Sequence, residues 1–191
     1  MNAREEMIIN KTLDVLDELK AMPTFQLCEY VTRETGLSEA LVKRIVEKYG
    51  KENTYIYNEH FVQKSDFDKP NRKQTIAFWA FTAIPDTEGN FRRAKWPASL
   101  IFRMKDDSRL FRITVCDNAD YDADVAALKQ LADKKKYVDI IASTESIQDI
   151  NKEMLPEADF IYAHVTGEIF NDVPEIKFVK VTCGQENDEN A

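Results

Sequence analysis

The sequence predicts an α/β chain, α+β overall, in which an N-terminal winged helix-turn-helix precedes a second domain built on a mixed β-sheet. Residues 8–49 repeat apolar side chains at three- and four-residue intervals, as amphipathic helices do. From residue 98 onward, short apolar runs rich in β-branched and aromatic residues alternate with helical segments, which is typical of strands and helices layered around a sheet. The 191 residues suffice for two such domains.

The expected boundaries follow from composition. Residues 65–72 are polar and interrupted by Pro70, so we expect a winged-helix domain over 1–64, a linker over 65–73 and an α/β domain over 74–183. The last residues, 184–191, are polar and acidic, which predicts a disordered tail.

The first helix is expected to bury an apolar stripe and to end at Pro23. Thr24 is a suitable N-cap for a second helix over 25–35, and Gly36 is expected to stop that helix. The stripe of the first helix comprises Ile8, Ile9, Leu13, Leu16 and Leu19; Leu27, Tyr30 and Val31 of the second helix are expected to face the same core.

A third helix is expected to begin directly after the N-cap Ser38, so that the segment 35–39 forms a tight helix-turn-helix joint. At 100° per residue its apolar and polar side chains separate onto two sides. Leu41, Val42, Ile45, Val46 and Tyr49 fall on the inner side, and Ala40, Lys43, Arg44 and Glu47 fall on the outer side. Residues 55–57 and 61–63 then flank the polar turn 58–60, which predicts a β-hairpin, the wing.

Two interpretations of the outer side are open. In winged-helix domains the third helix ordinarily enters the major groove of DNA and the wing lies beside the backbone. This places Ala40, Lys43, Arg44 and Glu47 of the helix, with Lys51, Asn58, His60 and Lys64 near the wing, at the DNA. The same fold also serves as a protein-docking module, and the acid Glu47 on the contact side favours that interpretation.

The second domain is expected to open with a segment, 74–83, whose periodicity fits a strand or a helix, the helix being preferred because Ile76, Trp79, Ala80 and Ala83 share one stripe. Strands are predicted over 98–104, 110–116, 137–142 and 160–165, the first two paired as a hairpin, with an edge strand over 176–181. Helices are predicted over 120–136 and 147–155.

The net charge of −8 opposes nucleic-acid binding, but the charge is unevenly distributed. Residues 1–73 hold 12 basic and 13 acidic residues, so 14 of the 26 basic and 21 of the 34 acidic residues follow them. One segment of the second domain is locally basic and is a candidate second basic surface. It contains Arg92, Arg93, Lys95, Arg103, Lys105, Arg109 and Arg112 against Asp106 and Asp107.

Several function classes lack their signatures. Cys28, Cys116 and Cys183 have no paired spacing, and His60 and His164 have no second ligand at metal-binding distance in the sequence, so neither a disulfide framework nor a metal site is predicted. The five scattered glycines form no phosphate-binding loop, and no cofactor is predicted. Cys116 with His164 is an unfavoured nucleophile pair, since a cysteine inside an apolar strand is usually an inert thiol. Without an apolar leader or span, we expect a cytoplasmic protein that does not contact membranes.

The order winged helix, linker, helix, hairpin, helix, strand resembles the replication-relaxation proteins of bacterial plasmids and conjugative elements and related uncharacterised mobile-element families. Their second domain is similar to the PD-(D/E)XK nuclease fold, in which a proline-aspartate pair opens one strand and an acid lies in the next. The matching segments here are 96–102, Trp-Pro-Ala-Ser-Leu-Ile-Phe, and 111–117, Phe-Arg-Ile-Thr-Val-Cys-Asp. The resemblance implies a degenerate, restriction-endonuclease-like domain.

The nuclease chemistry requires carboxylates that converge on Mg²⁺, whereas the matching places hold Ala98 and Thr114, and Cys116 stands where a lysine is expected. Asp86, Glu88 and Asp117 are the remaining candidates, and acids in such positions are more often solvated loop residues. No catalytic residue is therefore predicted. The resemblance implies a non-catalytic DNA-binding accessory protein of a mobile element; the alternatives are a protein-interaction module that does not bind DNA and, less favoured, a divergent Mg²⁺-dependent nuclease.

Overall fold

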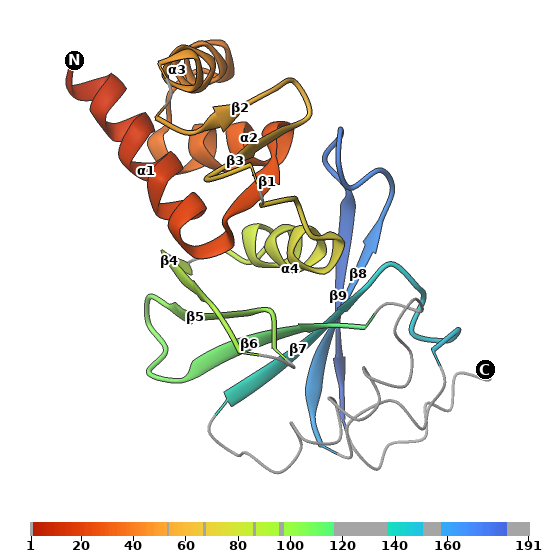
Figure 1. The fold of residues 1–191 in the computed structure, drawn as a ribbon. Coiled ribbons are helices and arrows are strands. Elements are labelled where there is room, and N and C mark those ends of the chain that lie inside the picture. Colours follow the sequence, from red (N-terminus) through yellow and green to blue (C-terminus); the bar gives the residue numbers. More distant parts are fainter. Residues whose placement is uncertain are drawn as a thin grey trace. The chain divides into compact units, whose positions relative to one another are not determined.

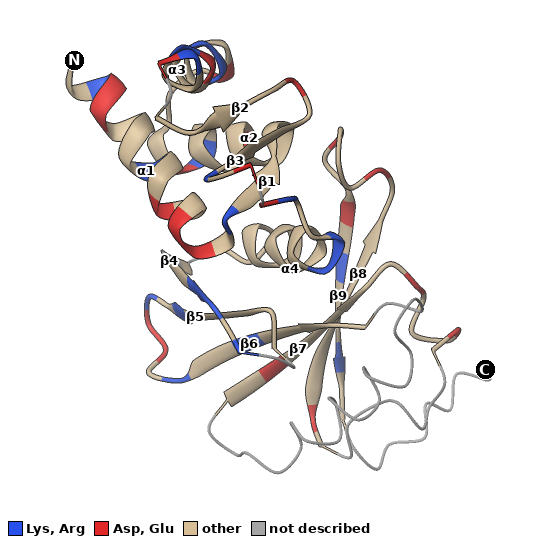
Figure 2. Cartoon of the chain, in the orientation of Figure 1, with Lys and Arg blue, Asp and Glu red and all other residues tan. Residues whose placement is uncertain are grey.

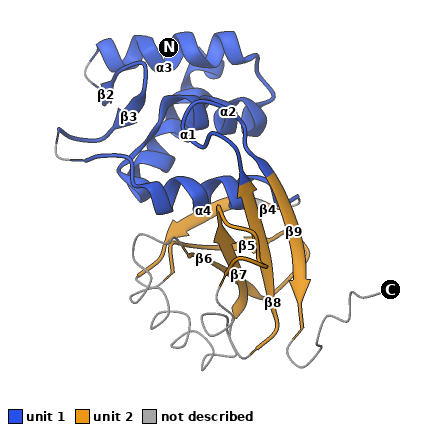
Figure 3. Cartoon of the chain, turned by 90° about the vertical axis from the view of Figure 1, so that its right-hand side faces the viewer, with its two compact units in different colours: residues 1–85, 166–175 blue, residues 86–165, 176–191 orange. Residues whose placement is uncertain are grey.

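The computed structural model describes residues 2–52, 54–66, 68–85, 87–95, 98–116, 137–150 and 158–182. Within these ranges the chain has four helices and two sheets, a mixture of α and β structure as the sequence predicts (Figure 1). It divides into two compact units, residues 1–85 with 166–175 and residues 86–165 with 176–191 (Figure 3).

The first helix, α1 (Ala3–Leu19), starts with a capping box: Glu5 N donates to Asn2 Oδ1 at 2.9 Å, and Asn2 N donates to Glu5 Oε2 at 3.3 Å. The predicted stripe is buried except for Leu13, which is half-buried. The expectation that Pro23 ends this helix is wrong. The helix ends at Leu19, because Lys20 takes a positive φ of 69°, and the chain continues as a short strand, β1 (Ala21–Pro23).

The second helix, α2 (Thr24–Thr35), begins one residue earlier than expected. Thr24 is its first residue and does not cap it; instead its Oγ1 donates to the carbonyl oxygen of Asn58 at 2.9 Å, and its N–H donates to that of His60. Thr24 therefore ties the start of α2 to the turn of the hairpin. Gly36 ends α2 with φ 66°, as predicted, since a residue without Cβ adopts this left-handed conformation at little cost.

The third helix, α3 (Glu39–Lys51), starts after Ser38, which occupies the N-cap position without a side-chain hydrogen bond. The predicted hairpin is present as β2 (Ile56–Tyr57) and β3 (Phe61–Gln63). The short strand β1, which the sequence does not predict, pairs antiparallel with β3, so the sheet order is β1-β3-β2. Three helices and a three-stranded antiparallel sheet thus form most of the first unit (Figure 1).

The preferred helix over 74–83 is confirmed as α4 (Arg72–Thr82), capped by Asn71, whose Oδ1 accepts from Gln74 N at 3.2 Å. Every residue from Thr75 to Phe81 is buried, so α4 is enclosed on all sides and has no single apolar stripe; Ala83, which was expected on that stripe, is exposed. The expected boundary near residue 73 is therefore displaced, because α4 belongs to the first unit.

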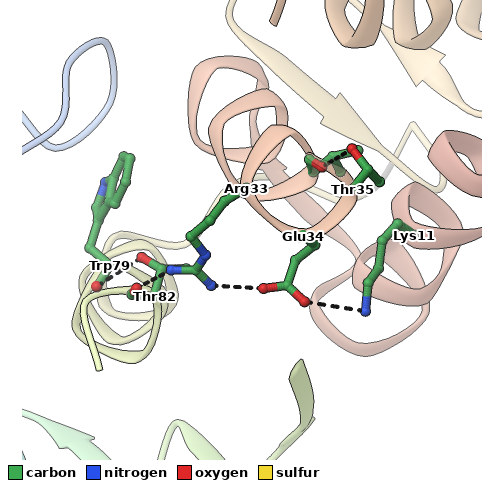
Figure 4. Close-up of polar contacts among 7 residues, drawn as sticks. Lys11, Arg33, Glu34, Thr35, Trp79 and Thr82 are labelled. Carbon is green, nitrogen blue, oxygen red and sulfur yellow. Dashed lines mark hydrogen bonds and ion pairs between the residues drawn. The ribbon is translucent and has the colours of Figure 1, made fainter. Parts of the chain in front are cut away.

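Contacts between α2 and α4 explain this membership. The ring of Phe78 stands edge-on to that of Tyr30 with centroids 5.0 Å apart, and Gln26 Nε2 donates to the Thr75 carbonyl at 2.9 Å. At the end of α4, Arg33 of α2 donates to the carbonyl oxygen of Thr82 and also pairs with Glu34, as Figure 4 shows. These bonds satisfy polar groups that burial of α4 removes from water.

The second unit contains a six-stranded sheet in the order β4-β5-β6-β7-β8-β9. Its strands are β4 (Thr87–Arg93), β5 (Leu100–Met104), β6 (Leu110–Val115), β7 (Tyr137–Ser143), β8 (Phe160–Thr166) and β9 (Glu175–Val181). The first three pair antiparallel and β6, β7 and β8 pair parallel, so the sheet is mixed, as predicted. The prediction missed β4, while the strands expected over 98–104, 110–116, 137–142, 160–165 and 176–181 are present with small shifts at their ends.

Some predictions concern residues that lie outside the described ranges. They are the helix expected over 120–136, the tail over 184–191 and the site candidates Asp86 and Asp117. Of the short helix expected over 147–155, only residues 147–150 are described, and these form a turn.

Candidate nucleic-acid interface

The third helix presents the side that the sequence predicts. Ala40, Lys43 and Arg44 are exposed and Glu47 is partly exposed, whereas Val42, Ile45 and Val46 on the opposite side are buried. Leu41 and Tyr49, also expected on the inner side, are half-buried. The outer side of α3 is therefore available to a partner along about two turns of helix, from Ala40 to Glu47.

The cations on α3 fall into two groups, those that form an ion pair and those that form none with the described residues. Lys51 pairs with Glu47 at 2.6 Å, and Lys48 pairs with Glu5 of α1 at 3.4 Å. The pKa of Glu47 lies below its usual value because Lys51 hydrogen-bonds its carboxylate, with a further contribution from the charge of Lys43. Within the described part of the chain, no hydrogen bond or ion pair joins Lys43 or Arg44 to another side chain.

The hairpin uses one predicted contact residue for its own turn. Asn58 Oδ1 accepts from the backbone N–H groups of His60 and Phe61, both at 2.8 Å, and so holds the turn closed. His60 is exposed at the tip. Lys64, the last predicted contact, forms an ion pair with Asp17 of α1. Lys43 and Arg44 are thus the predicted contact cations that make no ion pair with a described carboxylate, and the acids Glu39 of α3 and Glu59 of the hairpin turn are also exposed.

In the second unit, six of the seven predicted basic residues are exposed on or beside β4, β5 and the turn that follows. They are Arg92, Arg93, Lys95, Arg103, Lys105 and Arg109, and Figure 2 shows the basic colour running along these strands. Arg109 is bound through three hydrogen bonds to the carboxylate of Asp107, the shortest at 2.6 Å, which lowers the pKa of Asp107.

The prediction that Arg112 belongs to the second basic surface is wrong. It is only 5% exposed and lies opposite Asp139 in the parallel pairing of β6 and β7. Its Nε donates to Asp139 Oδ1 at 2.7 Å, its NH2 nitrogen lies 2.6 Å from the same oxygen, and its guanidinium lies over the ring of Tyr137 at 4.7 Å. A charge in an apolar strand requires such a partner, since an isolated one is costly to bury.

Burial raises the pKa of Asp139 above its ordinary value, and the hydrogen bond and charge of Arg112 act in the opposite direction. The two guanidinium contacts identify Asp139 as the partner that compensates Arg112 in the folded state. The pair therefore contributes little net charge to the surface around it.

The places that the nuclease resemblance identifies do not assemble a metal site in the described residues. Ala98 is buried, and Thr114 is 2% exposed with a hydroxyl that has no hydrogen-bond partner there. Nowhere in the described ranges do three or more His, Cys, Asp or Glu side chains gather as metal ligands. Asp86, Asp117 and the side chain of Glu88 lie outside the described residues.

Cys116 packs in an apolar cluster with Ile141, Ile150, Phe160 and Tyr162. His164 is half-buried and lies on β8, opposite Ser143 of β7. Because β7 separates β6 from β8, the two backbones stand about 9–10 Å apart. These positions favour the interpretation of Cys116 as a core thiol. Cys28 is likewise buried, and desolvation raises its pKa to about 12, which keeps the thiol protonated.

Asp139 is the residue that the sequence interpretation missed. Its signal is present in the sequence: Arg112 and Asp139 are single charges inside two otherwise apolar strands, and opposite charges in such positions are expected to meet across the sheet.

Comparisons with protein-family models, with curated proteins and with solved structures find no match to this chain. Among the described helices, none is both long enough and apolar enough to cross a membrane. The resemblance to replication-relaxation proteins accordingly stays a prediction.

Proposed function

We propose that this protein binds duplex DNA through the outer side of α3, in the manner of a winged helix-turn-helix, and that it does so without catalysing a reaction on the DNA. The observation that carries the proposal is the pair Lys43 and Arg44, adjacent, exposed and without an ion-pair partner among the described residues.

Charge pairing on the surrounding surface strengthens this argument. Lys48, Lys51 and Lys64 are each neutralised by a carboxylate of the chain itself, so their presence does not require an external anion. Lys43 and Arg44 have no such carboxylate in the described part of the chain, and a phosphate group supplies the missing charge. The adjacent Ala40 leaves room for close approach of a groove wall, which a larger side chain would obstruct.

The test is a fluorescence-anisotropy titration of labelled random duplex at several salt concentrations, with the wild type and the variant Lys43→Ala/Arg44→Ala. Loss of two phosphate contacts is expected to lower affinity at low salt by roughly tenfold or more. It is also expected to make the slope of log K against log salt shallower by about 1.8.

A matched control separates local contact from net charge. Lys69→Ala/Lys180→Ala also removes two exposed positive charges, from positions outside α3 and the hairpin, and is expected to bind as the wild type does. Equal weakening by both variants would attribute the binding to overall charge and not to α3, and wild-type protein that binds no duplex would refute the proposal.

A second function, docking of a protein partner on the same side of α3, is favoured by Glu47 and the exposed acids Glu39 and Glu59. These carboxylates repel phosphate but suit a partner with both signs of charge. The test is the binding of a basic peptide to the wild type and to Glu39→Gln/Glu47→Gln. Salt-dependent binding by the wild type, a salt dependence that the variant loses, and no binding of duplex would together support docking over DNA binding.

A further inference from the structure

We propose that the second unit carries its own phosphate-binding surface, the outward side of β4 and β5 at Arg92 and Arg103, here called the arginine face. Its partner is the backbone of duplex DNA, an identity that rests on the proposed function.

The alternation of burial decides which side of the sheet faces outward. Along β5, Leu100 and Phe102 are buried, whereas Ile101 is half-buried and Arg103 is exposed. Successive side chains of a strand point to opposite sides, so Ile101 and Arg103 lie together on the outward side. In the antiparallel register Arg92 of β4 pairs with Ile101, which places Arg92 on that side as well.

Arg92 and Arg103 are diagonal neighbours across two paired strands, because Arg103 follows Ile101 by two residues. Diagonal positions of this kind have Cα atoms about 7–8 Å apart, a distance over which two long side chains can contact neighbouring phosphates of one strand. The half-buried Ile101 between them supplies an apolar floor suited to sugar rings. Each guanidinium offers the planar fork of donors that fits phosphate.

The charges of the arginine face are not neutralised by the described part of the chain. Arg92 and Arg103 are exposed and make no ion pair there. Nearby cations differ in this respect, since Arg112 is compensated by Asp139 and Arg109 by Asp107. In a chain of net charge −8, two uncompensated arginines on one side of a sheet are a local exception that an external anion complements.

A polymer of phosphates fits this surface better than an acidic protein segment does. Lys105 is exposed in the turn that follows β5, two residues after Arg103, and extends the positive field of the arginine face. A nucleic-acid backbone presents regularly repeated charges to such a field, whereas an acidic peptide presents a few. Arginine and lysine at phosphates position a duplex without reading its sequence, so the arginine face is expected to add affinity and not specificity.

The experiment compares full-length wild type with Arg92→Gln/Arg103→Gln in the same random-duplex titration. Removal of two phosphate contacts is expected to make the slope of log K against log salt shallower by about 1.8. When salt is raised from 50 to 200 mM, the variant therefore loses about twelvefold less affinity than the wild type does. The control Arg93→Gln/Lys95→Gln changes the net charge equally, but Arg93 points to the other side of β4 and Lys95 follows its end. It is expected to retain the wild-type slope.

Outcomes for the two sites are distinguishable because the α3 variant is measured in parallel. A shallower slope for Arg92→Gln/Arg103→Gln supports the arginine face, whatever the result for Lys43→Ala/Arg44→Ala. An unchanged slope, or the same change in the control, overturns it even if α3 binds DNA. Polyglutamate is titrated as well. If polyglutamate binds through Arg92 and Arg103 and duplex does not bind, the proposal of a DNA-binding arginine face is overturned, because the partner would then be an acidic protein segment. Circular dichroism of each variant verifies that the fold is retained.

Discussion

At the scale of single residues, pairing decides what each charge in this chain can do. Arg112 belongs to the most basic segment of the sequence, yet it is buried against Asp139 and gives that segment no surface charge. Arg92 and Arg103, from the same segment, are exposed. The difference comes from strand alternation and from the neighbour that each position receives across the sheet, neither of which local charge density reveals.

Removal of Asp139 is the residue-scale test of this interpretation. Asp139→Ala leaves the guanidinium of Arg112 buried without its counter-charge, and breaking a buried pair from one side typically costs about 3–5 kcal/mol of unfolding free energy. Chemical denaturation followed by fluorescence measures this loss. The double variant Arg112→Leu/Asp139→Leu is expected to recover much of it, since an apolar pair needs no counter-charge.

The comparison for this prediction is Asp107→Ala, which breaks the exposed pair with Arg109. Solvent screens that pair, so a much smaller change is expected than for Asp139→Ala. Equal destabilisation by the two single variants would show that burial of Arg112 has no energetic consequence.

At the scale of secondary-structure elements, Gly36, before α3, and Gly50, in the last turn of α3, have different reasons to be glycine. Gly36 adopts φ 66° and has open space around its missing side chain, so its role is conformational. Gly50 lies within α3, and a Cβ there would collide with Cβ of Tyr57 in β2. That atom is part of the chain's own framework and cannot rotate away, so Gly50 sets how closely the hairpin packs on α3.

Gly50→Ala is therefore expected to destabilise the first unit although alanine is the better helix former. The gain in helix propensity is about 1 kcal/mol, while overpacking costs about 1–3 kcal/mol and moves β2 from α3. The melting temperature of Gly50→Ala, followed by circular dichroism, is the measurement. Gly36→Asn is the control, since asparagine tolerates a positive φ, and it is expected to melt close to the wild type. A melting temperature for Gly50→Ala at or above that of the wild type would contradict the packing argument.

At the scale of the whole molecule, the units do not follow the order of the sequence. The first unit ends at Pro85 and also includes residues 166–175, which lie between β8 and β9. Within that unit, Trp79 Nε1 of α4 donates to the carbonyl oxygen of Ile169 at 2.8 Å, and Ile169 is buried. A segment from late in the sequence thus completes the surroundings of α4.

Fragments of the chain test this organisation. A fragment over 1–64, the boundary expected from composition, lacks the aromatic side chains of α4 that pack on Tyr30, and each large apolar side chain contributes about 1.5–3 kcal/mol when buried. A fragment over 1–85 is expected to melt at a higher temperature than the 1–64 fragment, and the full chain at a higher temperature than either fragment. Thermal denaturation by circular dichroism measures the order, and identical melting of the two fragments would show that α4 does not stabilise the unit.

The sequence by itself determined the elements whose signal is local. Helical periodicity and the stop signal at Gly36 predict α1, α2 and α3, the polar turn 58–60 predicts the hairpin, and apolar runs predict β5 to β9. The outward orientation of Lys43 and Arg44 follows from the same periodicity, because burial of one side of a helix dictates the other.

Only the tertiary structure decided the features that depend on partners distant in sequence. The short strand β1 exists because β3 offers it an edge, and Thr24 is recruited by the hairpin turn in place of capping α2. The helix α4 packs against α2 and belongs to the first unit although it follows an apparent linker. Arg112 is withdrawn from the surface by Asp139, which lies 27 residues further along the chain. Such pairings are set by which strands and helices meet, and local propensity contains no information about that choice.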